Sequence, residues 1–221
     1  MKKSLCLLIS LLVASVIQAN ELYDAFPKDI HEDQRYVFYS HGLIVEGQNS
    51  RPVHPEFGIY DFPAIAQAIF KNGEFNLIAH HRPQNTDMFD YADQLVSWVD
   101  QLLQAGVSPS RISLVGFSRG GQITALASNS LKDTGINTAI MAICSNGDFR
   151  IDQPLEFGGN VLSIYETSDV VTSCNLLLER STDALSTKEV SISTGKKHGA
   201  FYTPLQEWIM PLKGWLKETN R

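Results

Sequence analysis

Short apolar runs alternate with longer amphipathic segments along most of the chain. The short runs are nearly continuous in apolar residues and rich in β-branched and aromatic side chains, which predicts buried strands. They cover residues 35–40, 75–81, 111–117, 138–144, 160–166 and 188–193. The longer segments repeat apolar residues at helical spacing and predict helices over 61–73, 88–106, 119–131, 172–185 and 203–216. Pro211 is expected to break or bend the last helix.

The regular alternation of strand and helix predicts an α/β fold. Such βαβ units build a mostly parallel sheet, here of about six strands, with helices on both faces. Strands buried on both sides are expected to be uniformly apolar, as these are. Ligands of such sheets bind beyond the carboxyl ends of the strands, so the residues that follow each strand are the candidates for chemistry.

The N-terminal segment predicts export. Lys2 and Lys3 precede a mostly apolar run over residues 5–17, which is shorter than the ~20 residues that a membrane-spanning helix needs. This pattern is typical of a signal peptide, expected over residues 1–19 with cleavage after Ala19. The alternative is an uncleaved membrane anchor. The mature chain, residues 20–221, then forms a single periplasmic or secreted domain.

Charge and cysteine content narrow the range of partners. The chain has 18 Lys and Arg against 24 Asp and Glu, and loss of Lys2 and Lys3 takes its net charge from −6 to −8. No basic cluster remains to bind nucleic acid. The rest of the sequence contains no second long apolar segment, so we expect no stable membrane insertion after cleavage.

Two cysteines, Cys144 and Cys174, remain after cleavage. In an oxidising compartment they could form a disulfide or stay as two separate thiols.

The most informative motif lies between a predicted strand and a predicted helix. Gly116-Phe117-Ser118-Arg119-Gly120 has the form G-x-S-x-G. In this context a sharp turn holds the serine in a strained conformation with its hydroxyl exposed at the end of the sheet. Side chains at Gly116 and Gly120 would crowd that turn. Ser118 is therefore the candidate nucleophile, and the alternative is a glycine-rich turn with a helix-capping serine.

A nucleophilic serine needs a base and an acid that orients the base. The chain order in this arrangement is serine, acid, histidine, and His198 is the only histidine after Ser118. His198 is the candidate base, with a surface histidine beside two lysines as the alternative. Asp169 and Asp148 both follow predicted strands. We prefer Asp169 because its strand directly precedes that of the histidine. Glu166 is a weaker third candidate, and Asp148 could be a simple turn residue.

Two backbone N–H groups are expected to hold the oxyanion that forms during acyl transfer. One belongs to Arg119, directly after the serine, and the other to Leu43, in the loop after the first predicted strand. Gly42 lets the backbone approach the ligand. His41 is expected to support this loop by hydrogen bonds, and a catalytic role for it is the weaker alternative.

A metal site is a second reading of several histidines. His80 and His81 could be grouped with His54 and Asp87, but neighbouring residues of a strand point to opposite faces. We expect a pocket-lining or structural role for the pair, with no metal and no cofactor required. The long, turn-rich segment 44–62 is expected to border the site, and a plain surface connection is the alternative.

These motifs resemble those of α/β-hydrolase-fold serine hydrolases, near the dienelactone hydrolase and small carboxylesterase branch. Residues 105–121, AGVSPSRISLVGFSRGG, are similar to the strand and nucleophile turn of that branch. HGL (41–43) and KKHGAFY (196–202) are similar to its oxyanion and histidine loops. The resemblance covers roughly residues 35–216. It implies a triad of Ser118, Asp169 and His198, with Leu43 and Arg119 as oxyanion donors.

The resemblance carries further implications and two departures. It implies that Cys144 and Cys174 lie at the same edge of the sheet and form a disulfide. No antiparallel lead-in strands and no cap domain are apparent in the sequence, which implies a minimal sheet. The candidate nucleophile is serine, whereas dienelactone hydrolases proper use cysteine.

The sequence therefore predicts an exported serine hydrolase of probable carboxylesterase type. Its partner would be a small-molecule acyl substrate, with a small ester, thioester or related acyl bond that is cleaved through an acyl-enzyme. One alternative is a catalytically inactive binding protein of the same fold. Another is a peptidase or a lipase on that fold.

Overall fold

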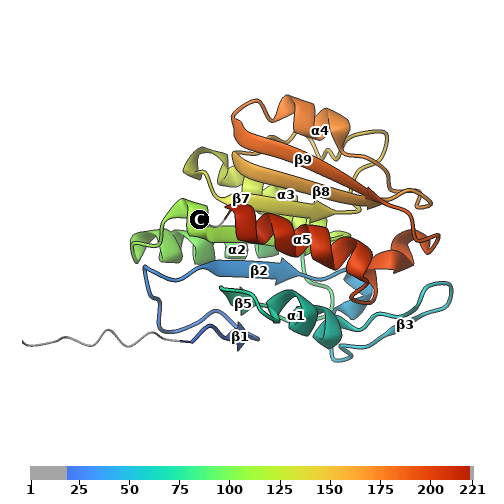
Figure 1. The fold of residues 1–221 in the computed structure, drawn as a ribbon, viewed down its shortest axis with the longest axis horizontal. Helices are drawn as coiled ribbons and strands as arrows, with labels where there is room; N and C mark the ends of the chain where they lie inside the picture. The colour runs from blue at the N-terminus through green and yellow to red at the C-terminus, as the bar shows by residue number, and fades with distance from the viewer. Residues whose placement is uncertain (1–18, 220–221) are drawn as a thin grey trace, which may run out of the picture.

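The computed structural model describes residues 19–219. The predicted signal peptide, apart from Ala19, lies outside these residues. Within them, strands and helices alternate along the chain and build a layered α/β structure (Figure 1). No helix in residues 19–219 has both the length and the apolar character needed to cross a bilayer.

The central sheet has seven strands within the described residues, and all neighbouring strands are parallel. In spatial order they are β1 (Leu22–Tyr23), β5 (Asn76–Ile78), β2 (Tyr36–Ser40), β6 (Ile112–Phe117), β7 (Asn137–Met141), β8 (Gly159–Glu166) and β9 (Ala184–Ile192). All six predicted strands are present. The two-residue β1 adds an edge that the apolar pattern did not indicate. Separately, β3 (Val53–His54) and β4 (Gly58–Ile59) form a small antiparallel pair.

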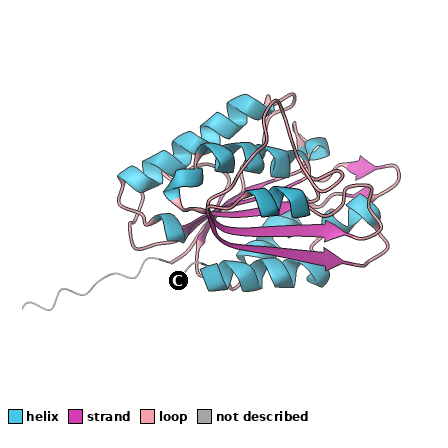
Figure 2. Cartoon of the chain, turned by 90° about the horizontal axis from the view of Figure 1, so that it is seen from above, coloured by secondary structure: helices cyan, strands magenta, loops and turns pink. Residues whose placement is uncertain are grey.

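Helices cover both faces of the sheet (Figure 2). One face carries α1 (Phe62–Phe70) and α5 (Gln206–Thr219). The other carries α2 (Met88–Gln104) and α3 (Arg119–Ser130). The short α4 (Asn175–Arg180) packs near β7 and β8. This arrangement confirms the predicted α/β architecture.

Alternation along β2 builds the core on both sides of the sheet. Tyr36 and Phe38 pack with α2 and α3, whereas Val37 and Tyr39 pack with α1 and α5. All four side chains are buried, and full burial of one large apolar side chain contributes about 1.5–3 kcal/mol to the stability of the fold.

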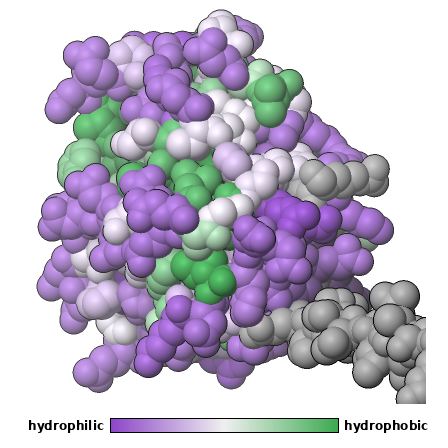
Figure 3. Space-filling model, turned by 90° about the vertical axis from the view of Figure 1, so that its left-hand side faces the viewer, coloured by the Kyte–Doolittle hydropathy of each residue, from purple (hydrophilic) through white to green (hydrophobic). Residues whose placement is uncertain are grey.

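The side of the molecule where the strands begin is mostly hydrophilic, with small apolar patches between polar side chains (Figure 3).

Several predicted boundaries were wrong. The helix expected over 172–185 is limited to α4, and β9 already begins at Ala184. This edge strand is largely exposed, so its sequence lacks the uniform apolar character of the inner strands. The strand expected over 138–144 ends at Met141, where Ala142 adopts a φ of 50° and redirects the chain. Finally, the last helix begins at Gln206 and ends at Thr219, and it continues through Pro211 without the predicted break. Pro211 has no N–H to donate to the carbonyl four residues before it. Because it lies near the start of the helix, only about one turn precedes this missing hydrogen bond.

Candidate active site

The parallel sheet gathers the predicted site residues at its carboxyl edge, on the side where the strand arrows of Figure 1 end. Ser118 directly follows β6, Asp169 follows β8, and His198 follows β9. The loop that contains Leu43 follows β2, which pairs with β6. Residues that are far apart in sequence therefore converge because their strands are parallel.

Ser118 occupies a strained turn between β6 and α3. Its backbone has a φ of 53° and a ψ of −123°, a conformation that costs a non-glycine residue about 1–3 kcal/mol. The turn is held by hydrogen bonds from the Ser118 N–H to the Met141 carbonyl, at 3.0 Å, and from the Gln122 N–H to the Ser118 carbonyl, at 2.9 Å. A Cβ atom at Gly120 would collide with the backbone of β2 and the residue after it. The predicted requirement for glycine at this position thus has a steric cause.

His198 lies between Ser118 and Asp169 and contacts both. Its Nε2 is 2.9 Å from Ser118 Oγ, and its Nδ1 is 2.7 Å from Asp169 Oδ2. A carboxylate can only accept, so Nδ1 carries the proton and Nε2 is left to accept from the serine hydroxyl. The side chain of His198 is 18% exposed and that of Asp169 only 3%. The structure therefore brings together all three residues of the predicted triad.

Asp148, the competing acid, is engaged elsewhere. Its carboxylate accepts hydrogen bonds from Arg180 at 2.6 and 3.0 Å and also pairs with Arg150. Burial alone would raise its pKa, but the hydrogen bonds and charges of the two arginines outweigh that effect and hold the pKa below 3.8. Asp148 is thus an ion-paired group rather than a partner of His198.

Glu166, the third candidate acid, contacts two neighbouring loops rather than His198. Its buried carboxylate accepts from the N–H and hydroxyl of Ser168 and from the N–H and hydroxyl of Thr194, at 2.8–3.2 Å. Burial tends to raise its pKa, but these hydrogen bonds lower it below 4.5. Ser168 is next to Asp169, and Thr194 precedes His198 by four residues. Glu166 therefore links the loop of the acid to the loop of the histidine.

The predicted oxyanion donors both begin helices. Arg119 is the first residue of α3, and Leu43 is the first residue of a short 3-10 helix over Leu43–Val45. The N–H of a first helical residue has no acceptor within its own helix, so neither group takes part in the hydrogen bonds of its own helix. The neighbouring Gly42 N–H is instead occupied by the Tyr60 hydroxyl at 3.0 Å. A Cβ atom on Gly42 would lie only 3.1 Å from the Tyr60 ring.

His41 forms hydrogen bonds at the start of the loop after β2, which contains Leu43. Its side chain is completely buried. Nε2 accepts a hydrogen bond from the Arg82 N–H at 3.0 Å, which leaves the proton on Nδ1 to be donated to the Gly42 carbonyl at 2.9 Å. Burial, together with the charge of Arg82, holds the His41 pKa well below 6.5. The residue is therefore a neutral structural imidazole.

The other histidines have local partners. His80 Nδ1 lies 2.8 Å from the Tyr91 hydroxyl, and His81 Nε2 lies 2.6 Å from the Val45 carbonyl. Within residues 19–219, no group of three or more His, Cys, Asp or Glu side chains is arranged to hold a metal ion.

The segment 44–62 borders the site through its β3–β4 hairpin. The ring of Phe57 lies 6.4 Å from that of His198, and Glu56 forms an ion pair with Lys197 at 2.8 Å. The hairpin thus packs against the histidine loop, in the position expected from the sequence.

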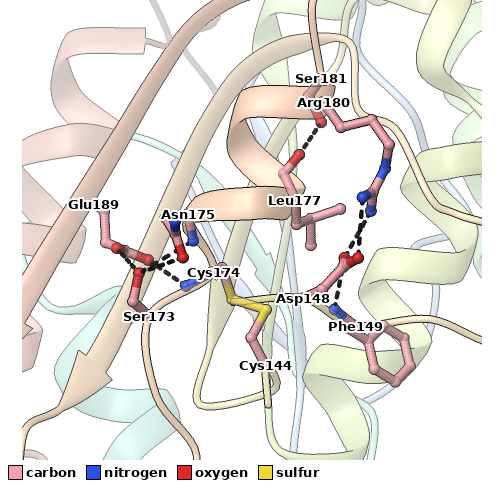
Figure 4. Close-up of a disulfide and its surroundings, with 10 residues drawn as sticks. All are labelled: Cys144, Asp148, Phe149, Ser173, Cys174, Asn175, Leu177, Arg180, Ser181 and Glu189. Atoms are coloured by element: carbon pink, nitrogen blue, oxygen red, sulfur yellow. Dashed lines mark hydrogen bonds and ion pairs between the residues drawn. A yellow bond between two sulfur atoms is a disulfide. The ribbon is translucent and has the colours of Figure 1, made fainter. Parts of the chain in front are cut away.

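A disulfide joins the loops after β7 and β8. Cys144 and Cys174 are bonded, with their Cα atoms 5.2 Å apart, which confirms the predicted pairing (Figure 4). The Thr172 N–H also donates to the Cys144 carbonyl at 2.9 Å. Asp169 lies a few residues before these contacts, so the chain that carries it is tied to its neighbour.

Comparison with known proteins identifies the fold. No protein-family model matches the sequence, and no curated protein sequence does either. Among solved structures, SOBER1 of Arabidopsis thaliana is 15% identical, with a TM-score of 0.58 over 85% of this chain and 100% of that one. An esterase from the bacterial hormone-sensitive lipase family is 14% identical, with a TM-score of 0.60 over 89% of this chain and 80% of its own.

A structure described as arylesterase is similar to the same extent, with 13% identity and a TM-score of 0.60 over 89% of this chain and 79% of that one. The neighbours share the α/β-hydrolase fold. The chain therefore has this fold, as its resemblance implied. At these identities the likeness establishes the fold alone.

Proposed function

We propose that the protein is an exported serine hydrolase that cleaves a small ester, thioester or related acyl bond through an acyl-enzyme. One observation carries this proposal: His198 lies within hydrogen-bond distance of both Ser118 Oγ and the Asp169 carboxylate. The esterases among the structural neighbours support the choice of reaction class.

The proposed mechanism assigns a role to each of the three residues. As Ser118 Oγ attacks the acyl carbon, His198 Nε2 takes the hydroxyl proton, and Asp169 stabilises the resulting imidazolium. The bond from the acyl carbon to the leaving group then breaks, and His198 returns the proton to the leaving group. Water attacks the acyl-enzyme with His198 again as the base, which releases the acid and restores the Ser118 hydroxyl.

The negative charge that develops on the acyl oxygen needs fixed donors. The N–H groups of Arg119 and Leu43, each at the start of a helix, are proposed to hold it, aided by the N-terminal end of α3. Donors that belong to helix starts are preorganised, so they need no rearrangement as the charge forms.

The strain at Ser118 argues against an inactive binding protein of the same fold. A positive φ at a serine costs free energy, and such strain is typical of functional sites. A capping role would not account for it either, because the Ser118 side chain makes no capping hydrogen bond to α3. The strained turn instead presents Oγ to His198.

Labelling with a fluorophosphonate and turnover of short acyl esters, thioesters and peptides test the proposal together. We expect the wild type to be labelled on Ser118 and to hydrolyse at least one ester or thioester. Ser118→Ala should abolish labelling and lower turnover by ~10⁶-fold, while the exposed Ser97→Ala should change neither. Labelling that persists in Ser118→Ala would exclude Ser118 as the nucleophile, and an unlabelled, inactive wild type would favour the binding-protein alternative.

Export is proposed from two features. Residues 1–19 have the composition of a signal peptide, and structural disulfides such as Cys144–Cys174 persist mainly in oxidising compartments. N-terminal sequencing of the protein from the periplasm or culture medium should give Asn20 as the first residue. A protein that still begins at Met1 and stays with the membrane would support the anchor alternative.

A further inference from the structure

We propose that Arg82 is a positioning residue for the oxyanion hole, and that its pairing with Glu46 fixes the orientation of the Leu43 N–H. The inference rests on the proposed function. Arg82 is not itself in the triad: none of its hydrogen bonds in the described chain reaches Ser118, Asp169 or His198. It acts through the loop that supplies the Leu43 N–H.

Arg82 holds both ends of that loop at once. On one side, its backbone N–H donates to His41 Nε2 at 3.0 Å and its Nη2 donates to the His41 carbonyl at 2.6 Å. On the other side, its Nε and Nη2 contact Glu46 Oε1 at 3.3 and 3.4 Å. Leu43 lies between His41 and Glu46, so one guanidinium spans the turn that carries the proposed donor.

Further contacts make the two loops a single unit. The Gly47 N–H donates to the Arg82 carbonyl at 3.0 Å. The neighbouring His81 lies 2.6 Å, through Nε2, from the Val45 carbonyl. The segment after β5 is therefore attached along the whole oxyanion loop, and a change at Arg82 would be transmitted to Leu43.

The energetics of the pair favour a positioning role over a purely stabilising one. The side chains of Arg82 and Glu46 are 0% and 5% exposed, and removing two charges from water offsets most of the attraction between them. Arg82 Nη1 is buried and has no acceptor among the described residues. The guanidinium lies 5.5 Å from the centre of the Tyr91 ring. Apolar residues could fill this space without the desolvation free energy that two buried charges require. They could not, however, hold the two ends of a turn by directed hydrogen bonds.

The expected effect falls on turnover rather than on substrate binding. An oxyanion donor acts only when it lies about 2.7–3.1 Å from the developing anion, and complete loss of one lowers kcat by ~10²–10³-fold. A displaced Leu43 N–H should lose part of that effect. Replacing Arg82 by Met should therefore lower kcat by about 10–100-fold and leave KM nearly unchanged.

The experiment compares Arg82→Met, Arg82→Lys and Glu46→Gln with Arg180→Gln, a control that breaks another, partly exposed arginine–carboxylate pair. For each variant, kcat, KM, the rate of fluorophosphonate labelling and the melting temperature are measured on an ester that the wild type cleaves. We expect Arg82→Met to lose most kcat and labelling rate. Arg82→Lys should be intermediate, since an ammonium cannot span both ends, and Glu46→Gln should lose least. Arg180→Gln should lower only the melting temperature.

The outcomes separate this inference from the proposed function. If the wild type is active and Arg82→Met retains kcat within about 2-fold, far less than a misplaced donor would cost, the positioning role is wrong while the proposed function stands. A fall in kcat of equal size in Arg180→Gln would also overturn it, because general destabilisation would then be the cause. If Arg82→Met fails to fold, Arg82→Lys and Glu46→Gln decide by the same criterion. An inactive, unlabelled wild type would instead remove the proposed function.

Discussion

The loops after β7 and β8 both present an aspartate at the carboxyl edge of the sheet, but they give it different partners. Asp148, after β7, is covered by Arg180 and Arg150. Asp169, after β8, meets no arginine or lysine within ion-pair distance in the described chain and instead accepts from His198. Strand position alone made both residues candidates, and the neighbouring charges distinguish them.

The difference has a chemical consequence. An aspartate that orients a histidine must stabilise the imidazolium, and a carboxylate already neutralised by two guanidinium groups contributes little to that. The other carboxylate oxygen of Asp169, Oδ1, accepts from the Val170 N–H at 2.8 Å. Its charge is thus directed at His198. The aspartate after β8 thus contacts a histidine, whereas the aspartate after β7 is bound by two arginines.

The largest expected effect on this comparison comes from replacing each aspartate by asparagine. Asp169→Asn should lower turnover by ~10⁴-fold, as for the equivalent change in the serine-protease precedent, because the amide favours the wrong tautomer of His198. Asp148→Asn should change turnover by less than about 10-fold, since it touches no member of the proposed triad. Steady-state kinetics on the same ester measure both. Equal losses, or a larger loss in Asp148→Asn, would reverse the assignment of the two loops.

The disulfide that joins the two loops gives the second test. Cys174→Ser should lower the free energy of unfolding by about 3–4 kcal/mol in the chain-entropy model, because the bond closes a loop with a sequence separation of 30 residues. Activity should also fall at temperatures where the variant is still folded, since the chain of Asp169 becomes less constrained. Thermal unfolding and kinetics on the same sample measure both effects.

Mass spectrometry of the alkylated native protein supplies the control for that experiment. The wild type should show no free thiol at Cys144 or Cys174. Unchanged turnover after clean reduction would show that the bond stabilises the fold without holding the acid in place.

The smallest expected effect concerns the stability contribution of Asp148. Its side chain is 8% exposed and that of Arg180 20%. Breaking this partly exposed pair by Asp148→Asn should therefore cost about 2–3 kcal/mol near pH 7, somewhat less than the ~3–5 kcal/mol of a fully buried pair. The folded-state pKa of Asp148 is lowered, so its contribution is complete above the unfolded-state pKa and is lost as the pH falls through the folded-state value.

Urea unfolding of wild type and Asp148→Asn at pH 7 and near pH 3 measures this contribution. The difference in unfolding free energy between the two proteins should be larger at pH 7. A difference that is independent of pH would mean that the ion pairs with Arg180 and Arg150 do not contribute through charge.

Much of the fold and of the candidate site was predictable because the signals were local. The apolar runs located six strands, and the G-x-S-x-G turn placed Ser118 where its strained φ is observed. The order of serine, acid and histidine left His198 as the single choice. The strand β1 and the early start of β9 were missed because short or exposed edge strands lack the uniform apolar pattern of inner ones.

What the sequence by itself determined, then, were features encoded within a few neighbouring residues: the strand pattern, the strained G-x-S-x-G turn and the glycines that it needs. Only the tertiary structure decided the long-range pairs. It paired Asp148 with two arginines and Asp169 with His198, made Glu166 the link between two loops, and placed Arg82 against the loop after β2. The sequence alone does not show what a carboxylate or guanidinium will contact. Its role depends on which charges and hydrogen-bond partners the fold brings within about 3 Å of it.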